Sequence, residues 1–159
     1  MSAYSFVTHW AVDAPIEAVW AELYRPVDWP QWWRGVLSVD QIEAGDANGL
    51  GSYYRIVMRS ALPYRLDFNV RTTRLVRPTI IEARSDGELT GVGLWTLTPQ
   101  PTGTAIRYDW NVDTTKRWMR ALAPLARPIF EWNHDVIMRW GLEGLEDRLA
   151  GRPIARSPD

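Results

Sequence analysis

His134 is the strongest candidate for a functional residue, because a titratable side chain lies on the apolar face of the last predicted helix. At 100° per residue, from about residue 128 to 149, it shares one stripe with a glycine and hydrophobic residues: Phe130, Ile137, Met138, Gly141, Leu142, Leu145 and Leu149. Burial on such a face lowers the pKa of an imidazole and keeps the ring neutral. A neutral imidazole can donate a hydrogen bond to a carbonyl group or relay a proton.

Two interpretations of His134 stay open from the sequence. It is either a core histidine bonded to a strand residue, or an acid/base or hydrogen-bond donor in a ligand pocket. Its neighbours Asn133 and Asp135 are not expected to orient the ring, because adjacent helix residues do not face each other. A partner must therefore come from a strand. The candidates are three tyrosines: Tyr54, Tyr64 and Tyr108.

Tryptophan is unusually frequent, with ten residues in a chain of 159. An excess of this large, flat side chain fits a bulky core or a cavity with aromatic walls. Trp95, Tyr108 and Trp110 on the last two predicted strands, with Trp10 on the first, are expected to form such a wall. Gly141 leaves room either for close packing or for a ligand. The predicted ligand-binding residues are Trp10, Tyr54, Tyr64, Phe68, Trp95, Tyr108, Trp110, Phe130, His134, Met138 and Gly141.

Composition excludes several kinds of site. The chain has no cysteine, which excludes thiolate chemistry, and its two histidines are too few for a histidine-rich metal centre. It contains no glycine-rich phosphate loop and no nucleophile elbow. We therefore predict neither a metal nor a cofactor. A net charge of −1 gives no electrostatic argument for nucleic acid as a partner.

Membrane spanning and export are not predicted, because no apolar run approaches 18 residues and no signal peptide is recognisable. The sequence therefore predicts a cytoplasmic protein. The basic and aromatic segment 116–120 is expected to be either a solvated helix start or a site of transient contact with an anionic membrane. The oligomeric state is not predicted.

Strands are the elements that must position most of these residues. Alternating polarity and turn-forming separators predict seven of them, at 2–12, 36–43, 50–59, 64–75, 79–85, 89–98 and 103–113. Asp13 is expected to cap a helix that ends at Pro26, and a short helix or turn follows at 27–33. Pro124 and Pro128 are expected to kink or break the chain, so that the long helix begins near Pro128.

This element order predicts an α+β fold, β-α-α-β6-α, in which a curved seven-stranded antiparallel sheet wraps around the long C-terminal helix. The two early helices are expected to plug one end of the sheet. Residues 1–150 are predicted to form a single domain, and 151–159 a flexible tail.

Four stretches carry a family resemblance: APIEAVW at 14–20, WPQWW at 29–33, GLWTL at 93–97 with GTAI at 103–106, and NHD through MRWG at 133–141. Together with the element order, they resemble the START-like (helix-grip) superfamily, and within it the polyketide cyclase/dehydrase-like (SRPBCC) proteins. The resemblance covers residues 2–150. It implies the helix-grip fold and a ligand of the lipid, sterol, polyketide or aromatic class. Fold alone does not choose an activity among these members.

Three hypotheses of function follow. The first is a protein that binds an apolar small molecule, such as a lipid, polyketide or aromatic compound, in a cavity between the sheet and the last helix. The second is a cyclase/dehydratase-type enzyme in which His134 is the acid/base and a tyrosine holds an enolate oxygen. The third is an interaction module whose charged sheet face binds another protein.

Overall fold

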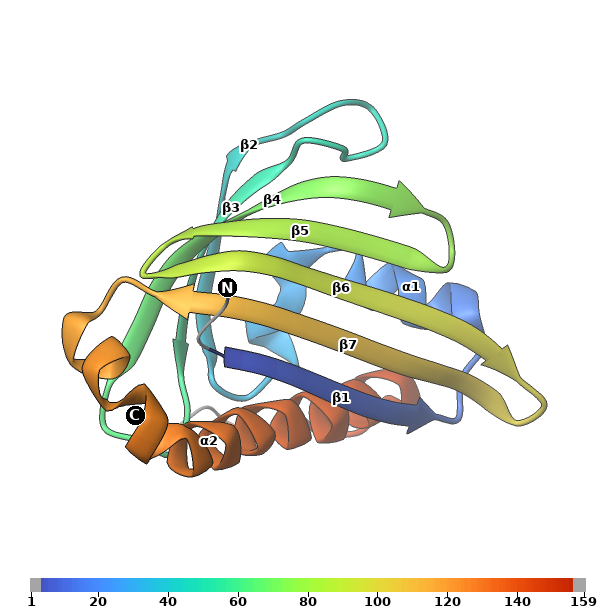
Figure 1. Cartoon of the computed structure of the whole chain (residues 1–159). Helices are drawn as coiled ribbons and strands as arrows, with labels where there is room; N and C mark the ends of the chain where they lie inside the picture. Colours follow the sequence, from blue (N-terminus) through green and yellow to red (C-terminus); the bar gives the residue numbers. More distant parts are fainter. Residues whose placement is uncertain (1–3, 156–159) are drawn as a thin grey trace.

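A curved antiparallel sheet faces one long helix in the computed structural model, which describes residues 4–155 (Figure 1). The helices are α1 (Ile16–Leu23), the 3-10 helix η1 (Pro26–Gln31) and α2 (Arg117–Ala150). The strands are β1 (Tyr4–Val12), β2 (Val36–Glu43), β3 (Tyr53–Arg59), β4 (Arg65–Val76), β5 (Ile80–Gly87), β6 (Leu89–Gln100) and β7 (Gly103–Thr114). The predicted order β-α-α-β6-α is confirmed. Positions 2 and 3 of the first predicted strand, and 156–159 of the predicted tail, lie outside the described residues.

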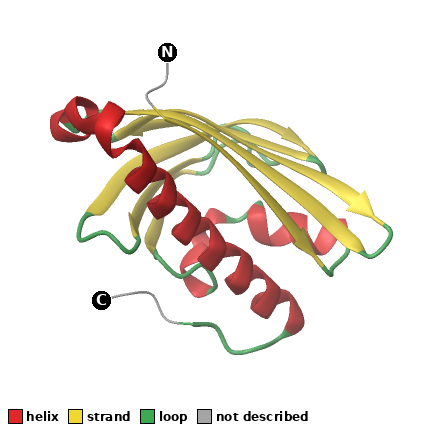
Figure 2. Ribbon diagram, turned by 60° about the horizontal axis from the view of Figure 1, so that its bottom comes forward, coloured by secondary structure: helices red, strands yellow, loops and turns green. Residues whose placement is uncertain are grey.

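The strands lie in the order β1-β7-β6-β5-β4-β3-β2, and every neighbouring pair is antiparallel. Strands β2 to β7 follow one another because short turns join them as hairpins. Strand β1 returns to pair with β7, so that Trp10 lies opposite Ile106. The expected neighbourhood of the first and last strands is confirmed. Figure 2 shows α2 running across the concave side of the sheet.

Helix α1 begins two residues later than a cap at Asp13 requires. Its N-cap residue is Pro15, in an extended conformation, and no side chain caps the helix. The prediction that Asp13 caps this helix is therefore wrong. Val19, Trp20 and Leu23 are its buried residues. Burial of this apolar face, rather than capping, holds α1 in place, against β6, β7 and α2.

Helix α2 begins at Arg117, eleven residues before the predicted start at Pro128. Pro124 and Pro128 lie inside it. Each proline removes one backbone hydrogen bond and crowds the preceding turn, which favours a bend. Figure 2 shows this bend near the N-terminal end of the helix. The helix continues through both prolines because Met119, Ala123 and Phe130 on its inner face are buried.

Residues after α2 remain close to the body of the protein as far as they are described. Gly151 ends the helix in the left-handed conformation, and Arg152 Nε donates a 2.8 Å hydrogen bond to Asp147. Ile154 packs against the hydrophobic core. Among residues 4–155, no helix is long and apolar enough to cross a membrane.

Candidate functional site

A cavity of about 140 Å³ lies between the concave face of the sheet and α2. Its walls are mostly hydrophobic, because inward positions of the strands alternate with outward ones and α2 adds its buried face. Eight of the eleven predicted ligand-binding residues line it: Tyr64, Phe68, Trp95, Tyr108, Trp110, Phe130, His134 and Met138. The tertiary structure thus brings together side chains from β3–β4, β4, β6, β7 and α2.

His134 lines this cavity from α2, and both of its ring nitrogens are buried without a hydrogen-bond partner in the described structure. Its ring stacks on Phe6 of β1, with the ring centroids 4.1 Å apart. An oxygen of Asp135 lies 3.9 Å from Nδ1, which is too far for a hydrogen bond. Burial lowers the pKa of His134 from 6.5 to about 4. The neutral ring therefore offers one donor and one acceptor.

The interpretation of His134 as a core histidine bonded to a strand residue does not match this geometry. None of the three candidate tyrosines pairs with its nitrogens, since the described structure gives the ring no partner at all. Buried polar atoms in proteins normally have a partner, in the protein, in water or in a ligand. The imidazole nitrogens are therefore left for a water molecule or a ligand group to pair with.

A polar cluster lines the cavity where the β3–β4 connection meets α2. Ser60 Oγ donates a 2.7 Å hydrogen bond to Asn133 Oδ1, and both residues line the cavity. Tyr64 lies in the same wall, and its ring meets Trp118 edge-on at 5.6 Å between centroids. Burial raises the pKa of Tyr64 to about 12, so its hydroxyl stays protonated at neutral pH.

Tyr108 stands in the middle of the aromatic wall that the sequence predicts. Its ring stacks on Trp95 at 4.1 Å, and Trp110 follows at 6.0 Å. Burial alone raises the pKa of its hydroxyl above the ordinary value of 10. The group is therefore a neutral phenol that can donate a hydrogen bond but cannot act as a base near pH 7.

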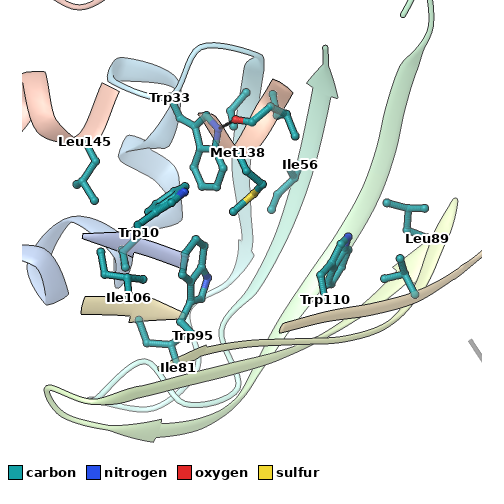
Figure 3. Close-up of a cluster of buried hydrophobic side chains, with 14 of the residues drawn as sticks. Trp10, Trp33, Ile56, Ile81, Leu89, Trp95, Ile106, Trp110, Met138 and Leu145 are labelled. Atoms are coloured by element: carbon teal, nitrogen blue, oxygen red, sulfur yellow. Dashed lines mark hydrogen bonds between the residues drawn. The ribbon is translucent and has the colours of Figure 1, made fainter. Parts of the chain in front are cut away.

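Three predicted site residues do not line this cavity. Trp10 packs edge-on against Trp33, and Tyr54 lines a second, smaller cavity. A Cβ atom on Gly141 would lie 2.5 Å from Cε2 of Trp33 and 2.9 Å from Cη2 of Trp10. Gly141 is therefore small because Trp33 packs over it. Figure 3 shows Trp10 and Trp33 together in the core, with the Trp33 N–H donating to the carbonyl oxygen of Ile137 at 2.8 Å.

Sequence reasoning missed several residues of the cavity wall: Tyr4, Phe6, Trp29, Trp33, Arg59, Ser60 and Asn133. Tyr4 and Phe6 stand at inward positions of the first predicted strand, so its alternation is a signal that identifies them. Trp29 and Trp33 belong to a short irregular segment without periodicity. Arg59 is the one charged side chain among the described lining residues, and no sequence pattern marks it.

An exposed apolar stripe, which we call the α2 stripe, follows the outer side of the N-terminal half of α2. Its five residues recur at alternating spacings of four and three, the period of one helix face. Leu125 is 83% exposed, and the others are about half exposed. The α2 stripe consists of Trp118, Leu122, Leu125, Ile129 and Trp132. It adjoins the cavity wall, because Trp118 contacts both Tyr64 and Phe130.

Side chains suited to a metal ion are not grouped in residues 4–155, where no cluster of three or more His, Asp or Glu is found. The polar side chains of the cavity are Arg59, Ser60, Tyr64, Tyr108, Asn133 and His134, and they are set in apolar walls. Such a cavity can bind an apolar molecule and orient one or two polar groups on it.

Residues 4–150 match the model of one protein family, described as "Polyketide cyclase / dehydrase and lipid transport". This range includes all the strands and helices and every residue of the cavity wall. The chain belongs to this family. The resemblance that the four sequence stretches indicate is confirmed. No curated protein is similar enough in sequence to count as a relative.

Solved structures with low sequence identity share the fold of this polyketide cyclase/dehydrase family member. The di-domain aromatase/cyclase BexL of the BE-7585A biosynthetic pathway is 19% identical, with a TM-score of 0.74. The alignment covers 94% of this chain but 51% of BexL, so the chain spans about half the length of that protein.

Two further structures match along almost their whole length. The START superfamily protein from Mycobacterium smegmatis is 13% identical, with a TM-score of 0.75 and 92% and 97% of the two chains covered. The ZhuI aromatase/cyclase from Streptomyces sp. R1128 is 16% identical, with a TM-score of 0.68 and 94% and 99% covered. These similarities show the helix-grip fold of the START/SRPBCC superfamily, as predicted.

Proposed function

We propose that this protein binds a small apolar molecule, a lipid, polyketide or aromatic compound with a polar substituent, in the cavity between the sheet and α2. One observation carries the proposal: His134, whose two buried ring nitrogens have no partner in the described structure, lines an apolar cavity of about 140 Å³. An apolar cavity of about 150 Å³ can hold benzene. The cavity therefore has room for one ring of a ligand, and its walls of Trp, Tyr and Phe favour stacking.

Native mass spectrometry of the purified protein tests the proposal directly. We expect a mass above that of the chain, which disappears when the protein is unfolded and yields an apolar compound on extraction. A second arm adds phenol to protein freed of such a compound and follows the indole N–H signals by NMR. Absence of a bound compound together with no shifts from phenol would contradict the proposal.

Substitution of His134 by phenylalanine is expected to weaken phenol binding about tenfold. Phenylalanine keeps the ring that stacks on Phe6 but leaves the ligand hydroxyl without a partner, and a buried unpaired polar group costs about 1–3 kcal/mol. NMR titration measures the dissociation constant. His9→Phe is the matched control, because His9 lies on the exposed side of β1. If His134→Phe and the parent protein bind phenol with equal affinity, His134 does not contact the ligand.

A second candidate function is a cyclase or dehydratase reaction in the same cavity, which the aromatase/cyclase structures among the neighbours favour. The neutral His134 would accept a proton from the substrate, and the phenol of Tyr108 would stabilise an enolate oxygen. The test needs a substrate that is turned over. Unchanged turnover by the His134→Gln variant would exclude this role.

Contact with a membrane surface is the second part of the proposal, and the α2 stripe supports it. Tryptophan at both ends of the stripe suits the headgroup region of a bilayer, and leucine or isoleucine between them suits the acyl boundary. Arg117, which has no acidic partner in the described structure, adds attraction to anionic lipid. An apolar ligand would then enter the cavity without crossing water.

Leu125→Glu is expected to reduce binding to vesicles of three parts phosphatidylcholine to one part phosphatidylglycerol about tenfold, since burial of a leucine side chain contributes about 1.5–3 kcal/mol. Cosedimentation measures the bound fraction. Val7→Glu is the control, because Val7 is 53% exposed on the outer face of β1. If the protein does not sediment with vesicles, or if both variants behave alike, the α2 stripe does not contact membranes. A concentration-dependent dimer lost in Leu125→Glu would instead indicate a protein partner.

Two parts of the sequence analysis remain predictions. A location in the cytoplasm is one. The other is that residues 1–150 form a single domain followed by a flexible tail.

A further inference from the structure

A second cavity, of about 50 Å³, lies beside the first and shares part of its wall. An apolar cavity needs about 150 Å³ to hold a benzene ring, whereas one water molecule needs only about 10–15 Å³. The second cavity is therefore too small for a ligand ring, but it has room for more than one water molecule. Four of the residues that line it carry hydroxyl groups: Tyr24, Tyr54, Thr72 and Tyr108. The proposed function does not account for this second cavity.

The hydroxyl of Tyr108 lies on the side of the second cavity. A Cβ atom on Gly93 would lie 2.6 Å from this hydroxyl oxygen. Gly93 lines the second cavity but not the first, and the same is true of Ala83, which pairs with Gly93 on β5. The ring of Tyr108 stacks on Trp95, with the ring centroids 4.1 Å apart. The ring therefore borders both cavities, and its hydroxyl lies at the second.

Three of the four hydroxyl groups have no hydrogen-bond partner among the residues that the structure describes, namely those of Tyr54, Thr72 and Tyr108. The hydroxyl of Tyr24 donates to the carbonyl oxygen of Asn48, and its oxygen can still accept a hydrogen bond. A buried water molecule typically makes about three hydrogen bonds to polar groups that otherwise lack a partner. The hydroxyl groups around the second cavity can supply these bonds.

Part of the wall of the second cavity lies at the periphery of the fold. Tyr24, Pro26, Gly49 and Leu75 belong to this part, and each of them is only half-buried. Tyr24 follows α1 directly, and Figure 1 shows α1 at the end of the sheet away from the N-terminal half of α2. Solvent is therefore close to the second cavity on the side of the fold away from the α2 stripe.

We propose that the second cavity is a hydration site, in which ordered water binds the hydroxyl of Tyr108 and links it to the hydroxyls of Tyr54 and Thr72. This water completes the hydrogen bonds of the Tyr108 phenol. It also holds the phenol in its stack with Trp95, in the aromatic wall of the first cavity. The inference does not depend on the proposed function, since it requires no ligand in the first cavity.

Contacts between water and methyl protons, measured by NMR in the parent protein, test the hydration site. Ala83 lines the second cavity, so its methyl protons should show NOESY and ROESY cross-peaks with water, with the signs typical of a long-lived bound water. Ala123 is the control in the same molecule, because it is buried and lines neither cavity. Its methyl protons should show no such cross-peak. Absence of the cross-peak at Ala83 as well would overturn the hydration site.

Tyr108→Phe provides an independent test through the sign of its effect on stability. Phenylalanine keeps the ring that stacks on Trp95 and removes only the hydroxyl. If water pairs with this hydroxyl, its removal costs a hydrogen bond, and the equilibrium constant for unfolding in urea should rise about fivefold. Tyr4→Phe is the reference, because the Tyr4 hydroxyl donates a 3.2 Å hydrogen bond to the carbonyl oxygen of Met119. An unchanged or lower constant in Tyr108→Phe would mean that the hydroxyl is unpaired in a dry cavity, which overturns the inference.

Discussion

Gly144→Ala is expected to lower the free energy of unfolding by about 3 kcal/mol, at the upper end of overpacking costs. A Cβ atom at this position would overlap the backbone carbonyl oxygen of Trp32, which a side-chain rotation cannot relieve. Trp32 is fully buried, so its backbone cannot move outward without disturbing the core. Helix α2 and η1 would have to separate, and the wall that η1 adds to the cavity would shift with them.

The sign of this effect distinguishes packing from helix propensity. In a helix interior, alanine is ordinarily favoured over glycine by about 1 kcal/mol. Gly141→Ala should be destabilising but less so than Gly144→Ala, because its obstacle is the ring of Trp33 rather than backbone. Ala121→Gly, at an exposed position of α2, should cost about 1 kcal/mol and reports the propensity alone. Urea unfolding measures all three. A Gly144→Ala protein as stable as its parent would contradict the packing of α2 on η1.

Acid is expected to destabilise the protein through His134, by up to about 3 kcal/mol between pH 7 and pH 4. The folded-state pKa of about 4 lies below the 6.5 of the unfolded chain. Between these two pH values the imidazole is protonated in the unfolded state but not in the folded state. The free energy of unfolding therefore falls as the pH decreases. Above pH 6.5 the imidazole is neutral in both states, and its titration contributes nothing to the pH dependence.

His134→Phe removes this dependence and serves as the test. The variant keeps a ring against Phe6, and its urea midpoint should fall less than that of the parent between pH 6.5 and pH 4. It should also be more stable at pH 7, because two unpaired buried nitrogens are removed. His9→Phe is the control, since the chain has only these two histidines and His9 is exposed. Identical pH profiles of the parent and His134→Phe would mean that the imidazole is hydrated in the folded protein.

Local patterns in the sequence are sufficient to predict the helices and strands and their order. Alternation in β4 and β7 is a property of successive residues, and the turn-forming separators lie between the strands in the sequence itself. The inward positions of these two strands and of α2 then identified six residues of the cavity wall, and Tyr64 and Trp95 bring the number to eight. The family resemblance could be recognised in the same way, because its four stretches are contiguous.

Two local signals, the expected cap at Asp13 and the two prolines, led to wrong predictions of where the helices begin. Pro124 and Pro128 predicted a helix start at Pro128, but the helix continues through both of them. The cost of a proline in a helix is a few kcal/mol, and the burial of Met119, Ala123 and Phe130 can offset it. Helix propensity determines the conformation of a segment only where packing does not. Packing dominates here because the sheet covers the apolar face of this segment.

Contacts between residues distant in sequence decided what the site is. His134 stacks on Phe6, 128 positions away, and Gly141 is small because Trp33 covers it. Tyr108 lines both cavities because β6, β7 and η1 pack together. The sequence by itself determined which side chains point inward, because that depends on backbone period. The tertiary structure decided which of them touch and where space remains between them, because cavities arise from the shapes of side chains on separate elements.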